Sequence, residues 1–379
     1  MRILLATVDF PPIEGGISSI SFHLAENLHR LFPSLTVLAP GFPGMEKWDR
    51  QRKYQVIRFP GYRYGILRFF PFALYLLALR LFKKYDLILA MNVGYGGLGG
   101  RILKFFSPTR YAVVTYAYEF LKYPVASLPD CLVRIALRNA EAILTISTFS
   151  RDELAGMGLP ADKIFIFPLG VDINIFQPAP ASPELVQAFG LAGKKVILTI
   201  ARLVERKGVD KLIKALSLVR EEVPEAVLLI VGRGPEEEKL RRLVRQYKLE
   251  DRVKFAGMVE HHLLPRYYNL CDVFCLPNRS GIRRGDVEGF GLVFLEANAC
   301  GKPVVGGNSG GARDAVEDEK TGFLVDPWRE EKIAEALVKL LGDDALRERM
   351  GKEGRKRVEK IYNWANSARV VKKLLQETI

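Results

Sequence analysis

The chain alternates short apolar runs with longer segments in which apolar residues recur every three or four positions. In the first half, the apolar runs predict strands at residues 2–8, 35–40, 54–60, 86–91, 110–117, 141–147 and 163–168. Amphipathic stretches such as 18–31 and 149–155 lie between most of these runs and predict helices. Because near-continuous apolar strands alternate with helices, we expect a doubly wound α/β domain with a parallel sheet covered on both faces.

The same pattern starts again in the second half. It predicts strands at 195–201, 226–232, 252–257, 272–277 and 303–306, and helices at about 209–222, 236–247 and 291–299. A proline-rich stretch separates the halves, and a last periodic segment near the end predicts a helix that crosses back to the first lobe, as terminal helices of two-lobed enzymes often do. The predicted organisation is a domain at 1–178, a linker at 179–193, a domain at 194–362 and a final helix within 363–379.

The segment 69–79 is apolar throughout. It is interrupted by Pro71 and is much shorter than the roughly 20 residues that a spanning helix needs. The preferred interpretation is a helix buried on the sheet. The alternative is a helix lying in a membrane interface. The basic residues that would then lie near lipid headgroups are Arg63, Arg68, Arg80, Lys83 and Lys84.

The length of 379 residues suits two domains, and 49% hydrophobic with 26% charged residues is typical of a globular protein. The net charge of +13 is unevenly placed, because residues 47–110 hold thirteen Lys or Arg and only two acidic residues, Asp49 and Asp86. Such a window indicates an anionic membrane surface, a nucleic acid or an acidic ligand, or else a merely solvated surface.

The four cysteines, at positions 131, 271, 275 and 300, lack the spacing of a metal site. Cys271 and Cys275 lie in an apolar run, so we expect buried free thiols. The first residues lead straight into a strand rather than into a cleavable signal peptide. We therefore expect a cytoplasmic protein, with peripheral association at the inner face of the cell membrane if the basic window contacts lipid.

The first candidate site is the loop between the first strand and the first helix, with Asp9, Gly15 and Gly16 before Ser18. Paired glycines let a ligand approach the backbone closely, and a helix that starts near Ser18 directs its free amides at an anion. The loop is not the GxGxxG fingerprint, which disfavours a dehydrogenase. A plain tight turn is the alternative.

A second candidate is the loop after the strand at 195–201, where Arg202 and Lys207 precede a helix. Two fixed cations could clamp a diphosphate and neutralise the charge that develops on a leaving group. Two unrelated surface cations are the alternative.

The strongest candidate is the segment 286–296, which joins a loop to a helix. Gly289 and Gly291 free backbone amides at the helix start for phosphate or sugar contacts. Glu288 and Glu296 are carboxylates, which accept hydrogen bonds from sugar hydroxyls. Because Glu296 lies within an apolar run, it is expected to have a partner rather than to face solvent.

The sequence contains neither a zinc motif nor a DxD metal motif, so no metal is expected. It also has no GxSxG element of a serine hydrolase.

Taken together, the motifs resemble those of retaining glycosyltransferases of the GT-B fold, family four, in order and over nearly the whole chain. The matching residues are Pro11-Pro12 with Gly15-Gly16, Ser147 with Ser150-Arg151, Pro168 to Asp172, Phe176 to Pro178, Arg202 with Lys207-Gly208, Val231-Gly232, and the pair Glu288 and Glu296. The stretch 283–289 is most similar to phosphatidylinositol-mannoside mannosyltransferases that use GDP-mannose. The resemblance implies two Rossmann-like domains facing a cleft, the first binding the acceptor and the second the nucleotide sugar.

The resemblance also implies roles for single residues. Arg202 and Lys207 would bind the donor diphosphate, and Glu288 would hold sugar hydroxyls while the leaving diphosphate departs. Glu296 would bind the ribose. Backbone contacts to the donor would come from Gly15, Gly16, Gly257, Val259, Gly289, Phe290, Gly291 and Leu292.

On the acceptor side, the resemblance implies contacts by Asp9, Tyr116 and Glu119. The family usually carries a pattern like His-Gly-x-Glu here, and this chain has Tyr116 in the place of the histidine. Tyrosine can donate a hydrogen bond but does not replace a histidine cation. The first position of this pattern is therefore a departure from the family.

The implied reaction is a front-face, retaining, metal-independent transfer of a hexose, with mannose favoured and GDP-mannose favoured over a UDP-sugar. The departing phosphate would take the acceptor proton. A lipid-linked or saccharide acceptor is favoured over a small soluble one. The Tyr116 substitution keeps open a non-catalytic nucleotide-sugar-binding module. A nucleic-acid partner is disfavoured, because no recognition motif accompanies the basic window.

Overall fold

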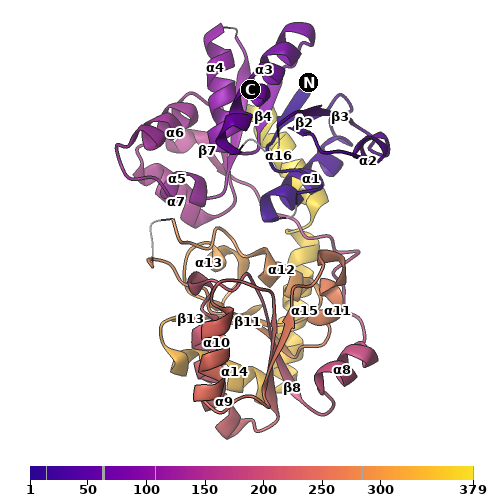
Figure 1. The fold of residues 1–379 in the computed structure, drawn as a ribbon, viewed down its shortest axis with the longest axis vertical. Helices are drawn as coiled ribbons and strands as arrows, with labels where there is room; N and C mark the ends of the chain where they lie inside the picture. The colour runs from indigo at the N-terminus through magenta and orange to yellow at the C-terminus, as the bar shows by residue number, and fades with distance from the viewer. Residues whose placement is uncertain (14, 62–64, 107, 283–284, 379) are drawn as a thin grey trace. The chain divides into compact units, whose positions relative to one another are not determined.

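The computed structural model describes residues 1–13, 15–61, 65–106, 108–282 and 285–378. The chain forms two compact units (Figure 1). Residues Met1–Gly170 and Trp364–Ile379 make up the first unit, and Val171–Asn363 make up the second.

The first unit is built on a seven-stranded parallel sheet in the order β3-β2-β1-β4-β5-β6-β7. The strands are β1 (Ile3–Ala6), β2 (Thr36–Pro40), β3 (Gln55–Phe59), β4 (Leu87–Ala90), β5 (Arg110–Thr115), β6 (Ala142–Thr145) and β7 (Ile164–Ile166). The central strands are apolar at almost every position and buried on both faces, as parallel strands under helices require.

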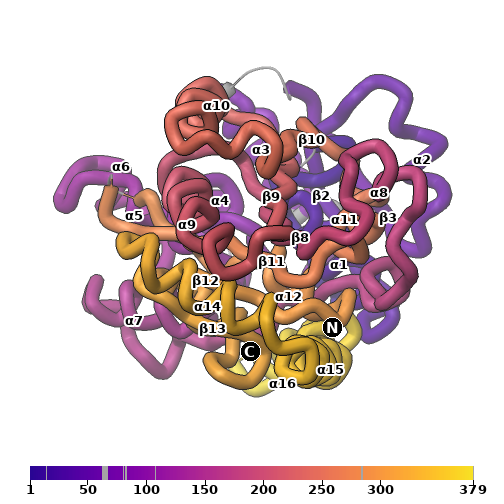
Figure 2. The backbone as a smooth tube through the Cα atoms, turned by 90° about the horizontal axis from the view of Figure 1, so that it is seen from below, coloured from indigo at the N-terminus to yellow at the C-terminus, as the bar shows by residue number. Residues whose placement is uncertain are grey.

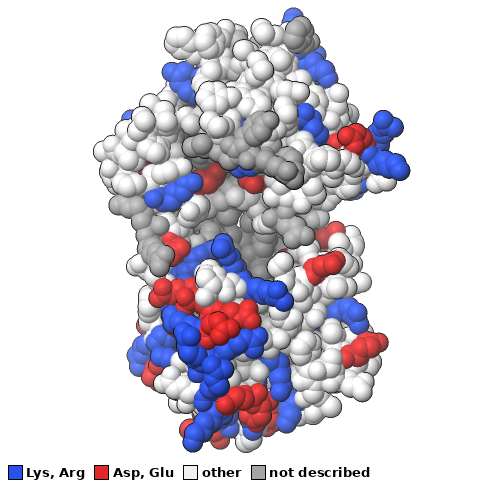
Figure 3. All heavy atoms as spheres, in the orientation of Figure 1, with Lys and Arg blue, Asp and Glu red and all other residues white. Residues whose placement is uncertain are grey.

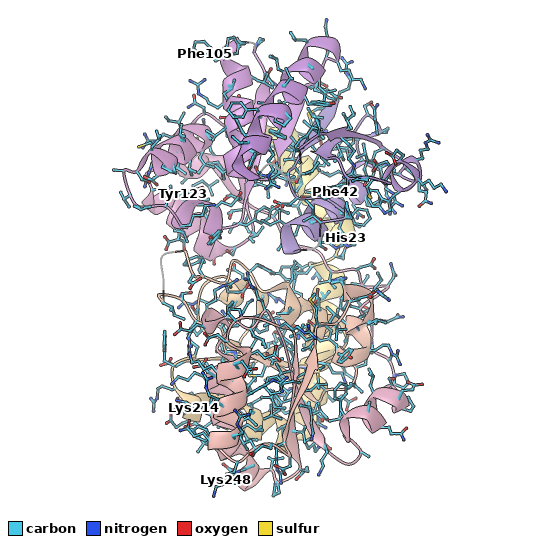
Figure 4. All side chains as sticks on the ribbon, in the orientation of Figure 1. His23, Phe42, Phe105, Tyr123, Lys214 and Lys248 are labelled. Carbon is cyan, nitrogen blue, oxygen red and sulfur yellow. The ribbon has the colours of Figure 1, made fainter. Side chains whose placement is uncertain are left out.

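The helices of this unit are α1 (Gly16–Leu28), α2 (Glu46–Arg50), α3 (Phe69–Phe82), α4 (Leu98–Phe106), α5 (Tyr118–Leu121), α6 (Leu128–Arg138), α7 (Thr148–Gly156) and α16 (Trp364–Thr378). A short π-helix, η2 (Val93–Gly97), follows β4. Helix α3 packs on α4, and α4 packs on α6. The terminal helix α16 returns to this unit and packs on α1. The ring of His23, which is labelled in Figure 4, stacks on the ring of Trp364 with 5.1 Å between the ring centres. The predicted crossover of the last helix is confirmed.

The second unit carries a six-stranded parallel sheet in the order β10-β9-β8-β11-β12-β13. Its strands are β8 (Lys195–Ile200), β9 (Ala226–Val231), β10 (Val253–Gly257), β11 (Val273–Leu276), β12 (Val304–Gly307) and β13 (Gly322–Val325). Its helices are α8 (Pro183–Phe189), α9 (Val209–Glu222), α10 (Glu237–Gln246), α11 (Leu264–Tyr268), α12 (Leu292–Ala299), α13 (Ala312–Ala315), α14 (Glu330–Gly342) and α15 (Asp344–Lys360). Helices α9, α10 and α14 lie on one face of this sheet, and α12 and α15 lie on the other (Figure 2).

Two parallel sheets with covering helices confirm the predicted fold class. The boundary between the units differs from the predicted one, because the division falls after Gly170 rather than at residue 178. Phe176 is buried in the second unit against the ring of Tyr268, and Arg355 donates a hydrogen bond of 2.8 Å to the carbonyl of Phe176. The proline-rich stretch marks a break in regular secondary structure, but the residues just before it already pack in the second unit. Within the expected linker 179–193, Pro183 begins helix α8.

The preferred interpretation of 69–79 as a buried helix is wrong for half of that helix. Phe72 and Leu76 are fully buried against the body of the first unit. The opposite side of α3 exposes a stripe of apolar side chains, including Phe70 and Leu74. None of the helices within the described ranges is long and apolar enough to cross a bilayer.

Each sheet has one place where successive connections leave in opposite directions. In the first unit this switch point lies between β1 and β4, and in the second it lies between β8 and β11. Open α/β sheets bind their ligands in the crevice at the carboxyl ends of the strands beside such a point. The two switch points are therefore the places where functional side chains are expected.

Candidate functional site

At the switch point of the second unit, a lysine and a glutamate meet from two different loops. Lys207 ends the short helix η4 (Glu205–Lys207) after β8, and Glu288 lies in the long loop after β11. The Nζ of Lys207 donates to Oε2 of Glu288, and both side chains are only 12% exposed. Arg206 adds a second cation, with its Nη1 at 3.5 Å from the same oxygen.

The electrostatics keep Glu288 ionised. Burial on its own would raise the pKa of this carboxyl, but Lys207 and Arg206 outweigh that effect and hold the pKa below its ordinary value. The site therefore contains a fixed carboxylate between two fixed cations. A carboxylate of this kind accepts hydrogen bonds from hydroxyl groups, and the cations suit phosphate oxygens.

Glycines fix the backbone on both sides of this ion pair. Gly208 follows Lys207 with a φ of +70°, and a Cβ there would lie 2.0 Å from the carbonyl oxygen of Pro277. Gly311 donates its amide to the carbonyl of Glu288 at 2.8 Å, and a Cβ on Gly311 would lie 2.1 Å from the carbonyl oxygen of Gly289. The loops that carry Lys207 and Glu288 therefore pack directly against neighbouring backbone, and these glycine positions leave no room for a side chain.

The predicted amide donors Gly289, Phe290, Gly291 and Leu292 follow Glu288 directly and lead into α12. Gly291 is the N-cap residue of α12, with a φ of +91°. The first amides of a helix have no partner inside the helix, so this start offers donors next to Glu288. The structure thus has these residues at the start of a helix, as the sequence predicted. Their contact with a ligand stays a prediction. Arg283 and Arg284, which belong to the matching stretch 283–289, lie outside the described residues.

The two predicted cations take different positions. Lys207 contacts Glu288, whereas the exposed Arg202 forms no ion pair with another described residue. The second cation beside Glu288 is Arg206, which also donates to the carbonyl of Val287 at 3.3 Å. The role of Arg202 toward the donor diphosphate stays a prediction. Sequence reasoning overlooked Arg206, although its position next to Lys207 in a single turn was an available signal.

The second glutamate, Glu296, has partners, as its apolar surroundings predicted. Tyr268 on α11 donates its hydroxyl to Oε2 of Glu296 at 2.7 Å, and Nε2 of His261 lies 3.5 Å from Oε1. The hydrogen bond with Glu296 raises the pKa of His261 against the opposing effect of burial. Neither partner was identified from the sequence. A role of Glu296 toward a ribose stays a prediction.

The predicted base contacts, Gly257 and Val259, lie at and just after the end of β10. Gly257 has a φ of +71° and accepts a hydrogen bond of 2.7 Å from the amide of Gly232. A polar cavity of about 520 Å³ lies beside it, with Arg233, Glu237 and Phe255 among its lining residues. The cavity gives a ligand access to this strand end.

At the switch point of the first unit, three acidic groups come together from the ends of β1 and β5. They are Asp9, Tyr116 and Glu119, and the charge of Asp9 adds to the effect of burial on the pKa values of the other two. Burial raises the pKa of Glu119 to about 8, and it raises the pKa of Asp9 although Arg68 opposes this. Burial also raises the pKa of Tyr116 well above its ordinary value.

Several polar atoms in this cluster are buried without a partner among the described residues: the hydroxyl of Tyr116, Oε2 of Glu119 and Nδ2 of Asn92. The other oxygen of Glu119 accepts from the amide of Val93 at 3.2 Å. Buried polar atoms are normally satisfied, so orphan donors and acceptors at a switch point are typical of a ligand site. The structure thus brings together the three residues that the sequence assigned to the acceptor.

The backbone beside Tyr116 is strained. Ala117 has a φ of +64° and a ψ of −60°, and the amide of Tyr118 donates across it to the carbonyl of Tyr116 at 2.7 Å. This is a γ-turn of the rare hand, which costs an alanine more than a glycine. The glycine of the His-Gly-x-Glu pattern falls on Ala117, so the local backbone keeps a shape that suits the family's glycine.

The paired glycines of the first loop also lie in open surroundings. Gly15 is the N-cap residue of α1, and a Cβ added to Gly15 or Gly16 would have no atom of the described, non-neighbouring residues within 4 Å. Helix α1 carries no acidic residue in its first turn. Both glycines are exposed, so there is space where the sequence predicted a ligand. Within the part of the chain that the structure describes, no group of three or more His, Cys, Asp or Glu could hold a metal ion.

Comparisons with known proteins agree with this organisation. A family model described as "Glycosyltransferase Family 4" matches residues 14–175, and one described as "Glycosyl transferases group 1" matches residues 182–357. The GDP-mannose-dependent alpha-(1-6)-phosphatidylinositol monomannoside mannosyltransferase of Mycobacterium tuberculosis is 34% identical, covering 96% of this chain and 95% of its own. A GDP-mannose-dependent mannosyltransferase of Corynebacterium glutamicum, named for the monoacylated form of the same lipid, is 31% identical over 96% and 94%.

Among solved structures, the sucrose-phosphate synthase of Thermosynechococcus elongatus is similar, with a TM-score of 0.81, 26% identity and coverage of 99% of this chain and 98% of that one. The two sheets and these similarities define the chain as a glycosyltransferase of the GT-B fold. It belongs to glycosyltransferase family four. The enzyme class is that of the hexosyltransferases.

Proposed function

We propose that the chain transfers mannose from GDP-mannose to a phosphatidylinositol-type glycolipid, with retention of the anomeric configuration. The observation that carries this proposal is the ion pair of Lys207 and Glu288 at the switch point of the second unit, next to the amides that start α12. Two curated relatives that match nearly the full length are named for this donor and this class of acceptor.

The charges suggest how the donor is bound. Glu288 accepts hydrogen bonds from the hydroxyls of the sugar, while Lys207, Arg206 and Arg202 face the diphosphate. In the absence of donor, Lys207 and Glu288 neutralise each other. Binding exchanges this single contact for two matched ones, with phosphate at the lysine and sugar hydroxyls at the glutamate.

In the reaction, the bond between the anomeric carbon and the diphosphate oxygen breaks, and the acceptor oxygen bonds to the same carbon from the same face. The acceptor proton passes to the departing phosphate oxygen, so no protein base is required. Negative charge develops on the leaving diphosphate as its bond to the sugar breaks and before the proton neutralises it, and Lys207 and its neighbouring arginines stabilise this charge. No step in this proposal uses a metal ion.

For the acceptor, we propose the cluster of Asp9, Tyr116 and Glu119. Its unpartnered hydroxyl and carboxyl atoms match a polyol, which both donates and accepts hydrogen bonds. A protonated Glu119 can donate as well as accept, and the Tyr116 hydroxyl can do the same. A lipid acceptor also brings the enzyme to the inner face of the cell membrane, which the basic window 47–110 favours.

The donor is tested by thermal unfolding with saturating GDP, UDP or ADP, each added alone. A ligand that binds only the folded protein stabilises it by about 2.7 kcal/mol at a hundredfold excess over its Kd. Stabilisation by GDP but not by UDP or ADP supports the proposed donor. A preference for UDP or ADP rejects mannose transfer from GDP, and the absence of any shift contradicts both the proposed donor and a non-catalytic nucleotide-sugar-binding module.

A further inference from the structure

Asn92 is a buried polar residue at the switch point of the first unit that the proposed acceptor cluster does not include. It lies two residues after β4, the strand between β1 and β5 in the sheet. Parallel pairing sets the carboxyl ends of these three strands side by side. Asn92 therefore follows the middle strand, while Asp9 follows β1 and Tyr116 follows β5.

The orientation of the Asn92 side chain is fixed by the backbone. Its Oδ1 accepts hydrogen bonds from the amides of Tyr95 at 3.0 Å and of Gly96 at 2.9 Å. Because an amide nitrogen cannot accept such bonds, the NH2 group of Asn92 must lie on the other side of the side chain. The turn that supplies these amides is the π-helix η2, and helices of this kind are rare and frequent at functional sites. This turn is tightly packed, since a Cβ on Gly96 would lie 2.7 Å from the Cβ of Ala90.

The NH2 group of Asn92 has no partner among the described residues. Nδ2 is buried, and Asn92 as a whole is only 4% exposed. A buried donor without an acceptor is costly for the folded protein, so a donor held in this way is typical of a ligand contact. Oε1 of Glu119 accepts from the amide of Val93, the residue after Asn92, at 3.2 Å. The unpartnered Oε2 of Glu119 and the unpartnered hydroxyl of Tyr116 thus belong to the same small region.

The polar atoms of this region favour a neutral ligand group that both donates and accepts hydrogen bonds. The NH2 group of Asn92 only donates, and an ionised Asp9 only accepts. A hydroxyl satisfies both, whereas a phosphate oxygen only accepts and would meet the charge of Asp9, although Arg68 lies near enough to lower the pKa of that carboxyl. Figure 3 shows few charged side chains on the face of the first unit that it draws. Hydroxyl groups therefore suit this region better than an anion does.

We propose that Asn92 is a specificity-determining residue for the acceptor, and that its NH2 group donates a hydrogen bond to a ring hydroxyl in the neutral polyol part of the acceptor rather than to a phosphate. The bonded hydroxyl is not the one that reacts, because a donated hydrogen bond draws electron density away from an attacking oxygen. This inference rests on the proposed function only in that the acceptor is a polyol bound by the first unit.

Two substitutions separate the ligand contact from the capping of η2. Asn92→Ser and Asn92→Asp both keep an oxygen that can accept from the amides of Tyr95 and Gly96, and both lack the NH2 group. Because Ser, Asp and Asn are similarly good N-cap residues, both variants are expected to unfold at nearly the wild-type temperature. Ser127→Ala is the control for a lost cap, since Ser127 caps α6 through the amide of Asp130 and lies outside the acceptor cluster.

The test measures equilibrium binding and transfer with a short-chain, water-soluble phosphatidylinositol monomannoside. In both Asn92 variants, the Kd and the KM for this acceptor are expected to rise roughly five- to tenfold, which is the effect of one lost hydrogen bond between neutral groups. The KM for GDP-mannose and the slow hydrolysis of GDP-mannose without acceptor are expected to stay at wild-type values, and Ser127→Ala is expected to match wild type throughout. Wild-type affinity for the acceptor in both Asn92 variants, or a rise confined to the KM for GDP-mannose, would overturn the proposal.

Acceptor analogues that each lack one ring hydroxyl identify the bonded group. Wild type is expected to lose roughly five- to tenfold in affinity for one of these deoxy analogues relative to the parent acceptor. Asn92→Ser is expected to show almost no further loss with that same analogue, because the partner of the missing hydroxyl is already absent. If the two losses multiply for every analogue, Asn92 bonds to no acceptor hydroxyl and the proposal fails.

The binding measurement keeps this inference separate from the proposed function. Acceptor binding that weakens on substitution of Asn92, without any mannose transfer by wild type, would refute the proposed function and leave the role of Asn92 standing. Transfer that neither substitution affects would do the reverse. If wild type does not bind the lipid analogue, the proposed acceptor is wrong, and titration with myo-inositol and with methyl α-mannopyranoside decides the role of Asn92. Binding of either one that Asn92→Ser weakens supports the role, and binding of neither overturns it.

Discussion

Replacing Lys207 by alanine removes one of the two cations that hold Glu288. The carboxylate is 12% exposed, and after the substitution only Arg206 remains, with its Nη1 at 3.5 Å. An ionised carboxylate that loses its only partner in a buried site costs ~3–5 kcal/mol of folding stability. Because Arg206 still compensates part of the charge, we expect a loss of ~1–2 kcal/mol in the free energy of unfolding at neutral pH.

The sign of the pH dependence follows from the lowered pKa of Glu288. A carboxyl whose pKa is lower in the folded protein than in the unfolded chain adds stability above its unfolded pKa, and this stability is lost as the pH falls through its folded pKa. In Lys207→Ala, burial is no longer outweighed by two cations, so the pKa of Glu288 rises. The difference in stability between wild type and variant is therefore largest at neutral pH and shrinks in acid. Urea unfolding at a series of pH values measures it.

The effect on catalysis is expected to be larger than the effect on folding. Removing a group that stabilises charge on a leaving group lowers kcat by ~10²–10³-fold. Lys211→Ala provides the control, because Lys211 forms a similar ion pair at 2.7 Å with Glu330 on α14 rather than with Glu288. Turnover by Lys207→Ala within a factor of three of the Lys211→Ala control, at saturating donor, would refute the role given to Lys207.

Three further predictions follow from buried or strained groups. Ala117→Gly is expected to raise the unfolding free energy by about 1 kcal/mol by relieving the positive φ, and an unchanged or lower thermal midpoint contradicts the strain. Wild type is expected to lose stability as the pH rises toward about 8, because folding raises the pKa of Glu119, whereas Glu119→Gln is expected to show a flatter profile in the same titration. Tyr268→Phe removes a hydrogen bond to the Glu296 carboxylate and is expected to cost ~1.5–3 kcal/mol in chemical denaturation, and a neutral result would contradict that bond.

Every strand of the first sheet was predicted, and all of the second except β13, because buried parallel strands are almost continuously apolar. The edge strand β13 has only four residues, and its two middle residues are only partly buried, so its pattern was missed. The polar helix α15 was not, since its apolar positions are few and it contains Gly351 and Gly354. These glycines are explained by packing, because a Cβ on Gly351 would lie 2.1 Å from the carbonyl oxygen of Gly301. A residue that discourages a helix locally is required there by a neighbouring segment. Sequence periodicity does not contain that information.

The candidate site was predictable in its residue types more than in its contacts. Motif spacing identified Lys207 and Glu288, which the fold brings together across 81 residues of chain. It did not identify Arg206, because the choice between two adjacent cations depends on how a single turn of η4 points its side chains. It also missed Tyr268, whose contact with Glu296 depends on how α11 packs on α12.

The proposed transfer of mannose from GDP-mannose to a phosphatidylinositol-type glycolipid can be tested directly. The most direct test incubates the purified full chain with radiolabelled GDP-mannose and phosphatidylinositol monomannoside, and determines the anomeric configuration of the extracted lipid by NMR. We expect a lipid product with one added α-linked mannose, formed by wild type and by Lys211→Ala but not by Glu288→Ala. A β-linked product, or full activity of Glu288→Ala, would contradict it.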